Sequence, residues 1–363
     1  MSLNAQTPAP ATPPFIAAKT DLLLVTGAAG FLGPKVVETL LAHGFQKIRC
    51  LVRPSSKLNH LSSICANNPG AQIEIVQGNL LSKEDCRKAA EGVSILYHVA
   101  AASEKSFAGT YLSTVVTTRN LLEGVAGQPG FKRFVNVGSL AVYSNSTLRR
   151  GQALDENCPV ESDPVGRNDP YCFGKLRQDE LVSLYGRTRG VPYVIVRPGP
   201  IYGPRSRAAV HGRVGIDTFG FFLHLGGGNQ VAFTYVDNCA DAIVRAGLVP
   251  GIEGEVFNIM DDDLPSSREF LAEFKRQAYP FRSFWVPYPV FLAFSVLWEK
   301  YSARSAGQLP PAFNRRLCAA YYRGDHYSNE KAKRLLGWKP GIDTVEGLRR
   351  HCEYFKQQRK TLS

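Results

Sequence analysis

The feature that most constrains this chain is a glycine-rich turn directly after a short apolar run. Leu22-Leu23-Leu24-Val25 is followed by Thr26-Gly27-Ala28-Ala29-Gly30-Phe31-Leu32-Gly33, and a helical pattern begins near Lys35. Three glycines at this spacing allow a tight turn, a close approach of backbone to phosphate, and close packing of the helix on the strand. The amides and positive dipole end of a helix N-terminus favour an anion. The turn therefore predicts a site for a dinucleotide pyrophosphate.

The pattern that follows predicts an α/β fold. Short apolar runs lie at 22–26, 48–52, 73–76, 95–99, 134–137 and 193–196. Helical stretches between them lie near 35–43, 83–91, 111–125 and 174–185. Such alternation is typical of a parallel sheet with helices on both faces, in which the strands are buried on both sides. We expect a Rossmann-type, doubly wound parallel sheet with a smaller, mostly helical C-terminal substrate lobe.

Three regions are expected along the chain. Residues 1–20, rich in proline and alanine, predict a disordered N-terminal extension. Residues 21–198 should form the dinucleotide-binding Rossmann domain. Residues 199–363 should form the substrate-binding lobe, with part of the chain returning to the sheet near 234–260.

Composition narrows the class of protein. Of the 363 residues 44% are hydrophobic, which is enough for a folded core, and no apolar run is long enough to span a membrane. The first residues lack the basic start and apolar centre of a secretion signal. The eight cysteines form no CxxC pair and the seven histidines show no ligand spacing. These features favour a reduced, cytoplasmic protein without a metal site.

The chain is basic, with a formal net charge of +12. Its basic residues are spread out, and no strongly basic run is interleaved with aromatic residues, so no nucleic-acid partner is expected. Attraction to a phosphate-bearing cofactor, an anionic substrate or a membrane surface remains open, as does a merely solvated basic surface.

A second constellation carries the chemistry. Tyr171 and Lys175 are four residues apart, so on a helix they share a face. An ammonium near a phenol favours the phenolate and lowers its pKa, which suits a general acid or base. Ser139 follows the apolar run 134–137, at the carboxyl end of a strand, where ligands bind in such sheets. The three residues predict hydride transfer between a nicotinamide and a small-molecule alcohol or carbonyl.

Cofactor choice is predicted from the end of the second apolar run. Leu51-Val52-Arg53-Pro54 contains no acidic residue to accept a bond from a ribose 2′-hydroxyl. Arg53 can pair with a 2′-phosphate instead. We therefore favour NADP(H), with NAD(H) open if Arg53 only stacks on the adenine.

These residues resemble the extended short-chain dehydrogenase/reductase family, in its epimerase/dehydratase group, over roughly residues 21 to 355. Further matching strings are Tyr97-His98-Val99-Ala100-Ala101, Asn120-Leu121-Leu122, Arg197-Pro198-Gly199-Pro200-Ile201-Tyr202-Gly203-Pro204, Tyr235-Val236-Asp237-Asn238 and Leu336-Gly337-Trp338-Lys339-Pro340. The resemblance implies that Ser139, Tyr171 and Lys175 are catalytic. It also implies a cofactor site made by Gly27, Gly30, Phe31, Leu32, Gly33, Arg53, Asn79, Leu80, Ala100, Ala101, Tyr171, Lys175, Pro198 and Gly199.

The chain departs from the family pattern at three places. Asn79 stands where an aspartate is frequent, although an asparagine can still bond to the adenine amino group. Thr114 stands where an asparagine is frequent, which puts the fourth member of the catalytic set in doubt. Leu140-Ala141 replaces the acidic pair of sugar 4,6-dehydratases, which argues against that reaction.

Two segments give competing hints about the substrate. Arg205, Arg207 and Arg213, with His211, could grip a sugar-nucleotide pyrophosphate or could form a solvated loop. The apolar segment 284–298 could line an apolar pocket, touch a membrane surface or be an ordinary buried helix. Its resemblance to the branch of 3β-hydroxysteroid and sterol dehydrogenases favours a sterol-like substrate.

Alternatives remain at this stage. The first is a nucleotide-sugar epimerase or reductase, and the second is a non-catalytic cofactor-binding sensor. A homodimer through a helix pair is common in the family, and the sequence leaves the oligomeric state open.

Overall fold

The computed structural model describes residues 15–101, 104–145, 148, 152–218, 220–306 and 308–362. Seven parallel strands form a central sheet in the order β12-β7-β5-β4-β1-β2-β3. Their bounds are β1 (Leu23–Thr26), β2 (Lys47–Val52), β3 (Gln72–Gln77), β4 (Ile95–His98), β5 (Arg133–Val137), β7 (Tyr193–Pro198) and β12 (Val256–Ile259). The expected Rossmann-type sheet is confirmed, and the chain returns to it through β12.

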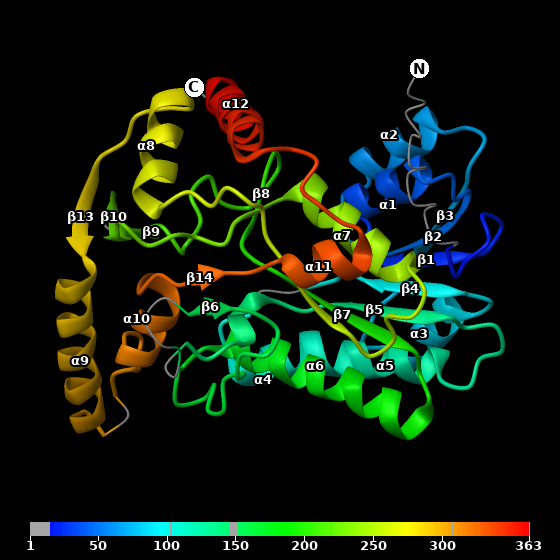
Figure 1. Ribbon diagram of the computed structural model, residues 1–363, viewed down its shortest axis with the longest axis horizontal. Helices are drawn as coiled ribbons and strands as arrows, with labels where there is room; N and C mark the ends of the chain where they lie inside the picture. Colours follow the sequence, from blue (N-terminus) through cyan, green and yellow to red (C-terminus); the bar gives the residue numbers. More distant parts are fainter. Residues whose placement is uncertain are drawn as a thin grey trace, which may run out of the picture.

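Helices cover both faces of this sheet (Figure 1). One layer contains α1 (Gly33–Ala42), α2 (Asn59–Asn67) and α7 (Val236–Leu248), and the other contains α3 (Lys83–Ala90), α5 (Thr117–Val125) and α6 (Pro170–Arg189). Leu23 and Val25 pack in the hydrophobic cluster beneath α1 and α7, whereas Leu24 packs in the cluster beneath α3 and α5. Successive strand residues point to opposite faces, so continuous apolar runs are what a doubly covered sheet requires.

The expected helix over 111–125 is longer and irregular. It begins as α4 (Phe107–Thr110), continues as a π-helical segment η1 (Tyr111–Val116) and ends as α5. Gly174 of α6 faces this helix: a Cβ there would lie 2.2 Å from Cγ2 of Thr110. Glycine at 174 therefore lets α6 approach α4 and η1 closely.

Two expectations about the N-terminal part need correction. Helix α2 was not expected, because its sequence is rich in Asn, Ser and His and only Leu61 and Ile64 are buried. Disorder was expected over 1–20, but the described part of that range is ordered. Ala17 is buried and the amide of Ile16 donates to the carbonyl of Leu248, while residues 1–14 lie outside the described part of the chain.

The C-terminal part is mostly helical, as expected, with a small added sheet of order β13-β10-β9. Its strands are β8 (Ile201–Tyr202), β9 (Gly215–Thr218), β10 (Phe221–Gly226), β11 (Thr234–Tyr235), β13 (Ser283–Pro287) and β14 (His326–Tyr327), and β14 pairs with β6 (Ala153–Leu154). Its helices are α8 (Ser267–Gln277), α9 (Tyr288–Arg304), α10 (Arg315–Tyr322), α11 (Glu330–Leu336) and α12 (Thr344–Leu362).

The apolar segment 284–298 is neither a single helix nor fully buried. It is divided between β13 and the start of α9, with Pro287 and Pro289 at the change of structure. Helix α9 lies at the edge of the molecule beside α10 (Figure 1). Among the described residues, no helix is both long and apolar enough to cross a membrane.

Candidate active site

The glycine turn joins β1 to α1, as expected. Gly27 has φ +67°, and a Cβ there would lie 2.8 Å from Cα of Ala100. A Cβ on Gly33 would lie 2.2 Å from the carbonyl oxygen of Gly27. Both positions therefore require glycine, the first for its backbone conformation and the second for close packing. The N-cap of α1 is Leu32, whose side chain offers no capping bond, so the first amides of α1 suit an anion such as a pyrophosphate.

The expected cofactor residues are gathered at one edge of the sheet. Parallel strands end at the same edge, and β1 and β4 are neighbours where the strand order reverses, which is where dinucleotides bind in such folds. The residues that follow or end these strands are Gly27, Gly30, Phe31 and Leu32 after β1, Arg53 after β2, Asn79 and Leu80 after β3, Ala100 and Ala101 after β4, and Pro198 and Gly199 at the end of β7. This arrangement fits a dinucleotide.

The turn after β3 is held by its own polar groups. Oδ1 of Asn79 accepts the amide of Leu81 at 3.0 Å, and the amide of Asn79 donates to Oδ2 of Asp85 at 2.8 Å. The carbonyl of Leu80 accepts Nδ2 of Asn120 at 2.9 Å. Asn79 therefore sits in a fixed turn, with its side-chain NH2 group available as a donor on another side.

The structure brings Ser139 and Tyr171 together. Ser139 follows β5, and its Oγ accepts the amide of Ala141 at 3.1 Å, at the start of the 3₁₀ turn η2 (Leu140–Val142). Tyr171 is the second residue of α6, whose N-cap Asp169 accepts the amide of Cys172 at 2.9 Å. Ser139 and Tyr171 lie close enough for the serine hydroxyl to act on the phenol. Both hydroxyl-bearing residues are thus found at the carboxyl edge of the sheet.

The pKa of Tyr171 differs from the expectation. Burial raises the pKa of its phenol, the nearby Ser139 hydroxyl and the charge of Arg213 oppose this rise, and the charges of Asp169 and Asp179 add to it. The net pKa is raised, whereas we expected Lys175 to lower it. Tyr171 still exposes 38% of its surface, so its ring is accessible from the adjoining cavity.

Lys175 shares α6 with Tyr171, but its ammonium points to the sheet. Its Nζ donates to the carbonyl of Val137 at 2.7 Å and to Oε1 of Gln178 at 3.0 Å. The side chain is 3% exposed, and this burial lowers the pKa of Lys175 to about 8. The expected contact between its amine and the phenol is replaced by bonds that hold the lysine beneath the site.

A buried hydrogen-bonded chain extends from Lys175 to the glycine turn, and sequence reasoning missed it. Nε2 of Gln178 donates to Oγ1 of Thr118 at 2.8 Å, and Nε2 of His98 lies 2.9 Å from the same oxygen. Nδ1 of His98 lies 2.9 Å from Oγ1 of Thr26, which also accepts the amide of Ala100. The signal available in the sequence was Gln178, three residues after Lys175 and hence on the same helical face.

The proton positions in this chain follow from its bonds. The hydroxyl of Thr118 donates to the carbonyl of Thr114 at 2.6 Å, so Nε2 of His98 must donate to Thr118. Nδ1 of His98 then accepts from Thr26. Burial lowers the pKa of His98 to about 3, so the imidazole is neutral, as this bonding pattern requires.

Tyr171 opens onto a cavity of about 430 Å³ between α6 and the C-terminal lobe. Apolar and aromatic side chains form much of its wall: Ile216, Leu225, Phe291, Phe313, Leu317, Tyr321 and Tyr322. Among the described lining residues, Lys105 is the cation, and Glu104 and Asp169 are the anions. Helices α9 and α10 supply much of the apolar surface, so the segment 284–298 contributes to the pocket through Phe291 and Ser295.

Of the basic residues in the loop after β7, Arg213 lies near this cavity, since its charge acts on the phenol of Tyr171. Arg205 and Arg207 are exposed. Arg213 donates to the carbonyl of Ala320 and lies 3.7 Å from the ring centroid of Tyr321. His211 accepts the amide of Arg213, and burial lowers its pKa to about 4. The four residues thus form no common anion site in the structure.

The fold and the site define a Rossmann-type enzyme that uses a nicotinamide dinucleotide. A model of the NAD dependent epimerase/dehydratase family matches residues 23–259, and the chain belongs to that family.

Its relatives differ in the substrates that their names give. A Bacillus subtilis (strain 168) protein named as an uncharacterized UDP-glucose epimerase, YtcB, is 29% identical over 253 residues, 65% of this chain and 76% of that protein. The decarboxylating sterol-4-alpha-carboxylate 3-dehydrogenase of Bos taurus is 25% identical over 365 residues, 95% of each chain. UDP-glucuronic acid 4-epimerase of Bacillus cereus, solved with NAD, shares the fold with a TM-score of 0.68 at 21% identity, over 93% of this chain and 99% of that one.

Proposed function

We propose that this enzyme transfers hydride between a nicotinamide and a secondary alcohol or ketone on a sterol-like molecule, with 3β-hydroxysteroids as the favoured class. The observation that carries the proposal is the phenol of Tyr171, close to Ser139, in the lining of a largely apolar cavity. A cavity of about 430 Å³ falls in the range of small-molecule sites.

The charge of the cavity favours an apolar substrate over a nucleotide sugar. A diphosphate carries two negative charges that need cationic partners when they leave water. Lys105 is the single cation among the described lining residues, where Glu104 and Asp169 also lie. Arg205 and Arg207 are not part of this lining. The Bos taurus sterol dehydrogenase, which aligns over 95% of this chain, supports the same preference.

The roles of the residues follow from their places. When bound, the cofactor accepts or supplies the hydride. Tyr171 would exchange a proton with the substrate oxygen, and Ser139 would hold that oxygen by a second hydrogen bond. Lys175 would hold the ribose, and the amides at the start of α1 would hold the pyrophosphate. The apolar walls on α9 and α10 would exclude water from the reacting carbon.

Arg53 supports NADP(H) as the preferred cofactor. It directly follows β2 and is exposed, so it would be free to pair with a 2′-phosphate. Titrating the purified protein with NADP⁺ and NAD⁺ tests this preference: tighter binding of NAD⁺ would contradict it.

The experiment that tests the reaction is a screen of 3β-hydroxysteroids against UDP- and GDP-sugars, followed by the absorbance of the reduced cofactor. A net absorbance change with a steroid supports the proposal. Isomerised sugar without a net change would instead establish the runner-up, an epimerase. Cofactor binding without turnover of either class would leave the sensor alternative.

Exposed apolar side chains support contact with a membrane surface. The exposed apolar side chains on β13 and α9 are Phe284, Trp285, Val290, Phe294, Leu297 and Tyr301. The exposed cations Lys300 and Arg304 lie near the end of α9. An amphipathic surface of this kind suits an anionic bilayer. We expect sedimentation with vesicles containing phosphatidylserine, weakened by Leu297→Ser but not by Val345→Ser on α12. Equal binding of both variants would contradict this contact.

A homodimer is supported by a second exposed apolar group on neighbouring helices. Tyr111 and Leu112 of η1 and Leu184 of α6 are exposed. Light scattering on the purified protein measures its oligomeric state directly. A monomer at micromolar concentration would contradict this proposal.

A further inference from the structure

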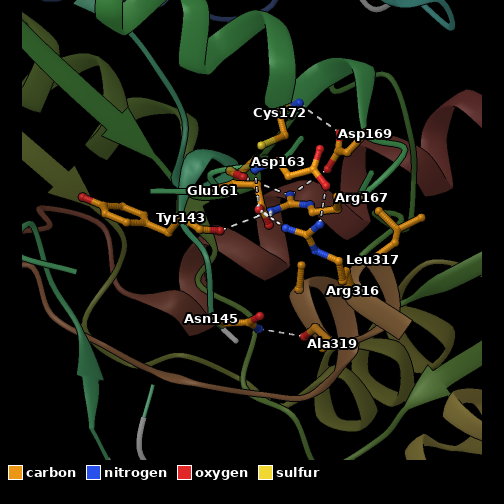
Figure 2. Close-up of polar contacts among 12 residues, drawn as sticks. Tyr143, Asn145, Glu161, Asp163, Arg167, Asp169, Cys172, Arg316, Leu317 and Ala319 are labelled. Atoms are coloured by element: carbon orange, nitrogen blue, oxygen red, sulfur yellow. Dashed lines mark hydrogen bonds and ion pairs between the residues drawn. The ribbon is translucent and has the colours of Figure 1, made fainter. Parts of the chain in front are cut away.

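A buried arginine connects the two halves of the catalytic pair. Arg167 lies in the turn before α6 and is 1% exposed. Its Nη1 donates to the carbonyl of Tyr143 at 3.2 Å. Its Nη2 donates to the carbonyl of Ala141 at 2.9 Å. The same nitrogen donates to Oδ2 of Asp169 at 2.7 Å (Figure 2). One planar guanidinium thus bridges a loop and a helix start.

Two of the partners of Arg167 support the two reacting hydroxyls. Ala141 donates its amide to Oγ of Ser139, and Arg167 holds this residue by its carbonyl. Asp169, two residues before Tyr171, caps α6 by accepting the amide of Cys172. Bonds to one side chain therefore tie the Ser139 loop to the first turn of α6.

The same cluster extends to the wall of the cavity. Asn314, the N-cap of α10, donates to the carbonyl of Arg167 at 3.0 Å. Arg316 pairs with Glu161 and, at 2.7 Å, with Asp163 (Figure 2). Leu317 and Cys318 of α10 line the cavity. The helix that forms the wall is thus tied to the turn that carries Arg167.

We propose that Arg167 is a positioning residue, which fixes the place of Ser139 relative to Tyr171 and anchors both to α10. The idea rests on the proposed function, because this placement matters for turnover only if Tyr171 exchanges a proton with the substrate. Lysine cannot replace arginine here, since a single ammonium lacks the planar fork that reaches two carbonyls and a carboxylate.

The test compares Arg167→Lys with Arg133→Lys. Arg133 is a matched control, because it is also fully buried, donates to two carbonyls, Ala246 and Val249, and pairs with one acid, Glu253. It lies at the amino end of β5, opposite the edge that carries Ser139. Both variants keep their charge and lose a buried guanidinium, so a merely structural role would give them the same phenotype.

The first readout is the titration of the Tyr171 phenol, followed by carbon NMR of protein labelled at tyrosine Cζ and assigned with Tyr171→Phe. The groups that act on this phenol are Ser139, Asp169, Arg213 and Asp179. Displacement of the Ser139 hydroxyl in Arg167→Lys should raise the pKa of Tyr171, because a nearby hydroxyl donor favours the phenolate. In Arg133→Lys the phenol of Tyr171 should titrate as it does in the wild-type protein. An unchanged Tyr171 titration in Arg167→Lys would overturn the proposal.

The second readout is turnover with the best steroid from the screen. A misplacement of about 1 Å can cost roughly 100-fold in rate, so kcat should fall by about that factor in Arg167→Lys while the Kd of the cofactor is unchanged. Equal losses in Arg167→Lys and Arg133→Lys would overturn the proposal.

A third variant covers the case in which Arg167→Lys does not fold. Arg316→Gln changes the partly exposed end of the same cluster, and we expect it to shift the Tyr171 titration in the same direction by a smaller amount. A wild-type titration in Arg316→Gln would overturn the link to α10. Because the NMR readout needs no substrate, failure of the steroid assay alone would contradict the proposed function and leave the positioning role standing.

Discussion

Nζ of Lys175 lies 3.0 Å from Oε1 of Gln178, one turn further along α6. Because Nε2 of the same amide donates to Thr118, Gln178 is the residue through which the lysine joins the chain that ends at Thr26. A glutamine is suited to this place, since it accepts on one side and donates on the other.

Gln178→Ala should therefore destabilise the protein. It leaves Nζ of Lys175 with the Val137 carbonyl and removes a donor from Thr118, so we expect a loss of about 1–3 kcal/mol in the free energy of unfolding. Urea unfolding measures it. Gln128→Ala, which removes a bond to the Val93 carbonyl far from the site, is the control and should cost less. Equal losses of unfolding free energy in the two variants would show that the buried chain of hydrogen bonds contributes no more to stability than the control bond.

Tyr171→Phe should abolish turnover without loss of cofactor binding. The phenol is the proposed proton-exchanging group, and such groups contribute about 10²–10⁴-fold to rate. Steady-state kinetics and a cofactor titration check the two halves of this prediction. Tyr111→Phe, on the neighbouring η1, should keep full activity. Normal turnover in Tyr171→Phe would refute the assigned mechanism.

Stability should rise with pH in the alkaline range because of Lys175. Its folded pKa of about 8 is below its ordinary value of 10.5, so between these values the unfolded chain binds more protons than the folded one. The cost of burying the ammonium is thus present below about pH 8 and disappears as pH rises toward 10.5. Relative to Lys175→Met, the free energy of unfolding of the wild-type protein should rise by up to about 3 kcal/mol across this pH window. If the unfolding free energies of the two proteins changed with pH in parallel, the result would contradict the lowered pKa of Lys175.

Arg53→Gln should weaken NADP⁺ binding by about 10- to 100-fold, since a charged hydrogen bond to phosphate contributes about 1.5–3 kcal/mol. NAD⁺ binding should change little. Lys57→Gln, which removes another exposed cation from the same loop, is the matched control. The prediction fails if both variants lose the same affinity, because the effect would then be one of general charge.

Gly33→Ala should disrupt the cofactor turn. The new Cβ would lie 2.2 Å from the carbonyl oxygen of Gly27, and backbone on both sides leaves it no room. We expect a lower melting temperature and loss of cofactor binding. Gly70→Ala, at a position with no atom within 4 Å, should behave like wild type. Retained cofactor affinity in Gly33→Ala would contradict the assigned role of the turn.

Most of the sheet could be predicted because its central strands are buried on both faces and therefore appear as largely apolar runs, whereas the edge strand β3 is only partly buried. The placement of Ser139 near Tyr171 was also within reach, since the two residues stand at a strand end and a helix start. Helix α2 was not, because Leu61 and Ile64 alone bury apolar surface there.

Other features depend on contacts that are distant in sequence. The direction of Lys175 is set by the Val137 carbonyl, 38 residues away, and the bridge made by Arg167 depends on Ala141, 26 residues away. The division of 284–298 into β13 and α9 depends on pairing with β10. Local patterns carry no information about such partners.

The hydroxyl of Thr118 has a consequence for the direction of proton donation beneath the site. It donates to the carbonyl of Thr114 in η1, four residues earlier, as the hydroxyls of Thr39 and Thr188 also do in their helices. Loss of this acceptor would free the hydroxyl to point at His98, and the imidazole would then have to switch tautomer and reverse the donors back to Thr26. One backbone carbonyl therefore sets a single orientation for the whole row of bonds.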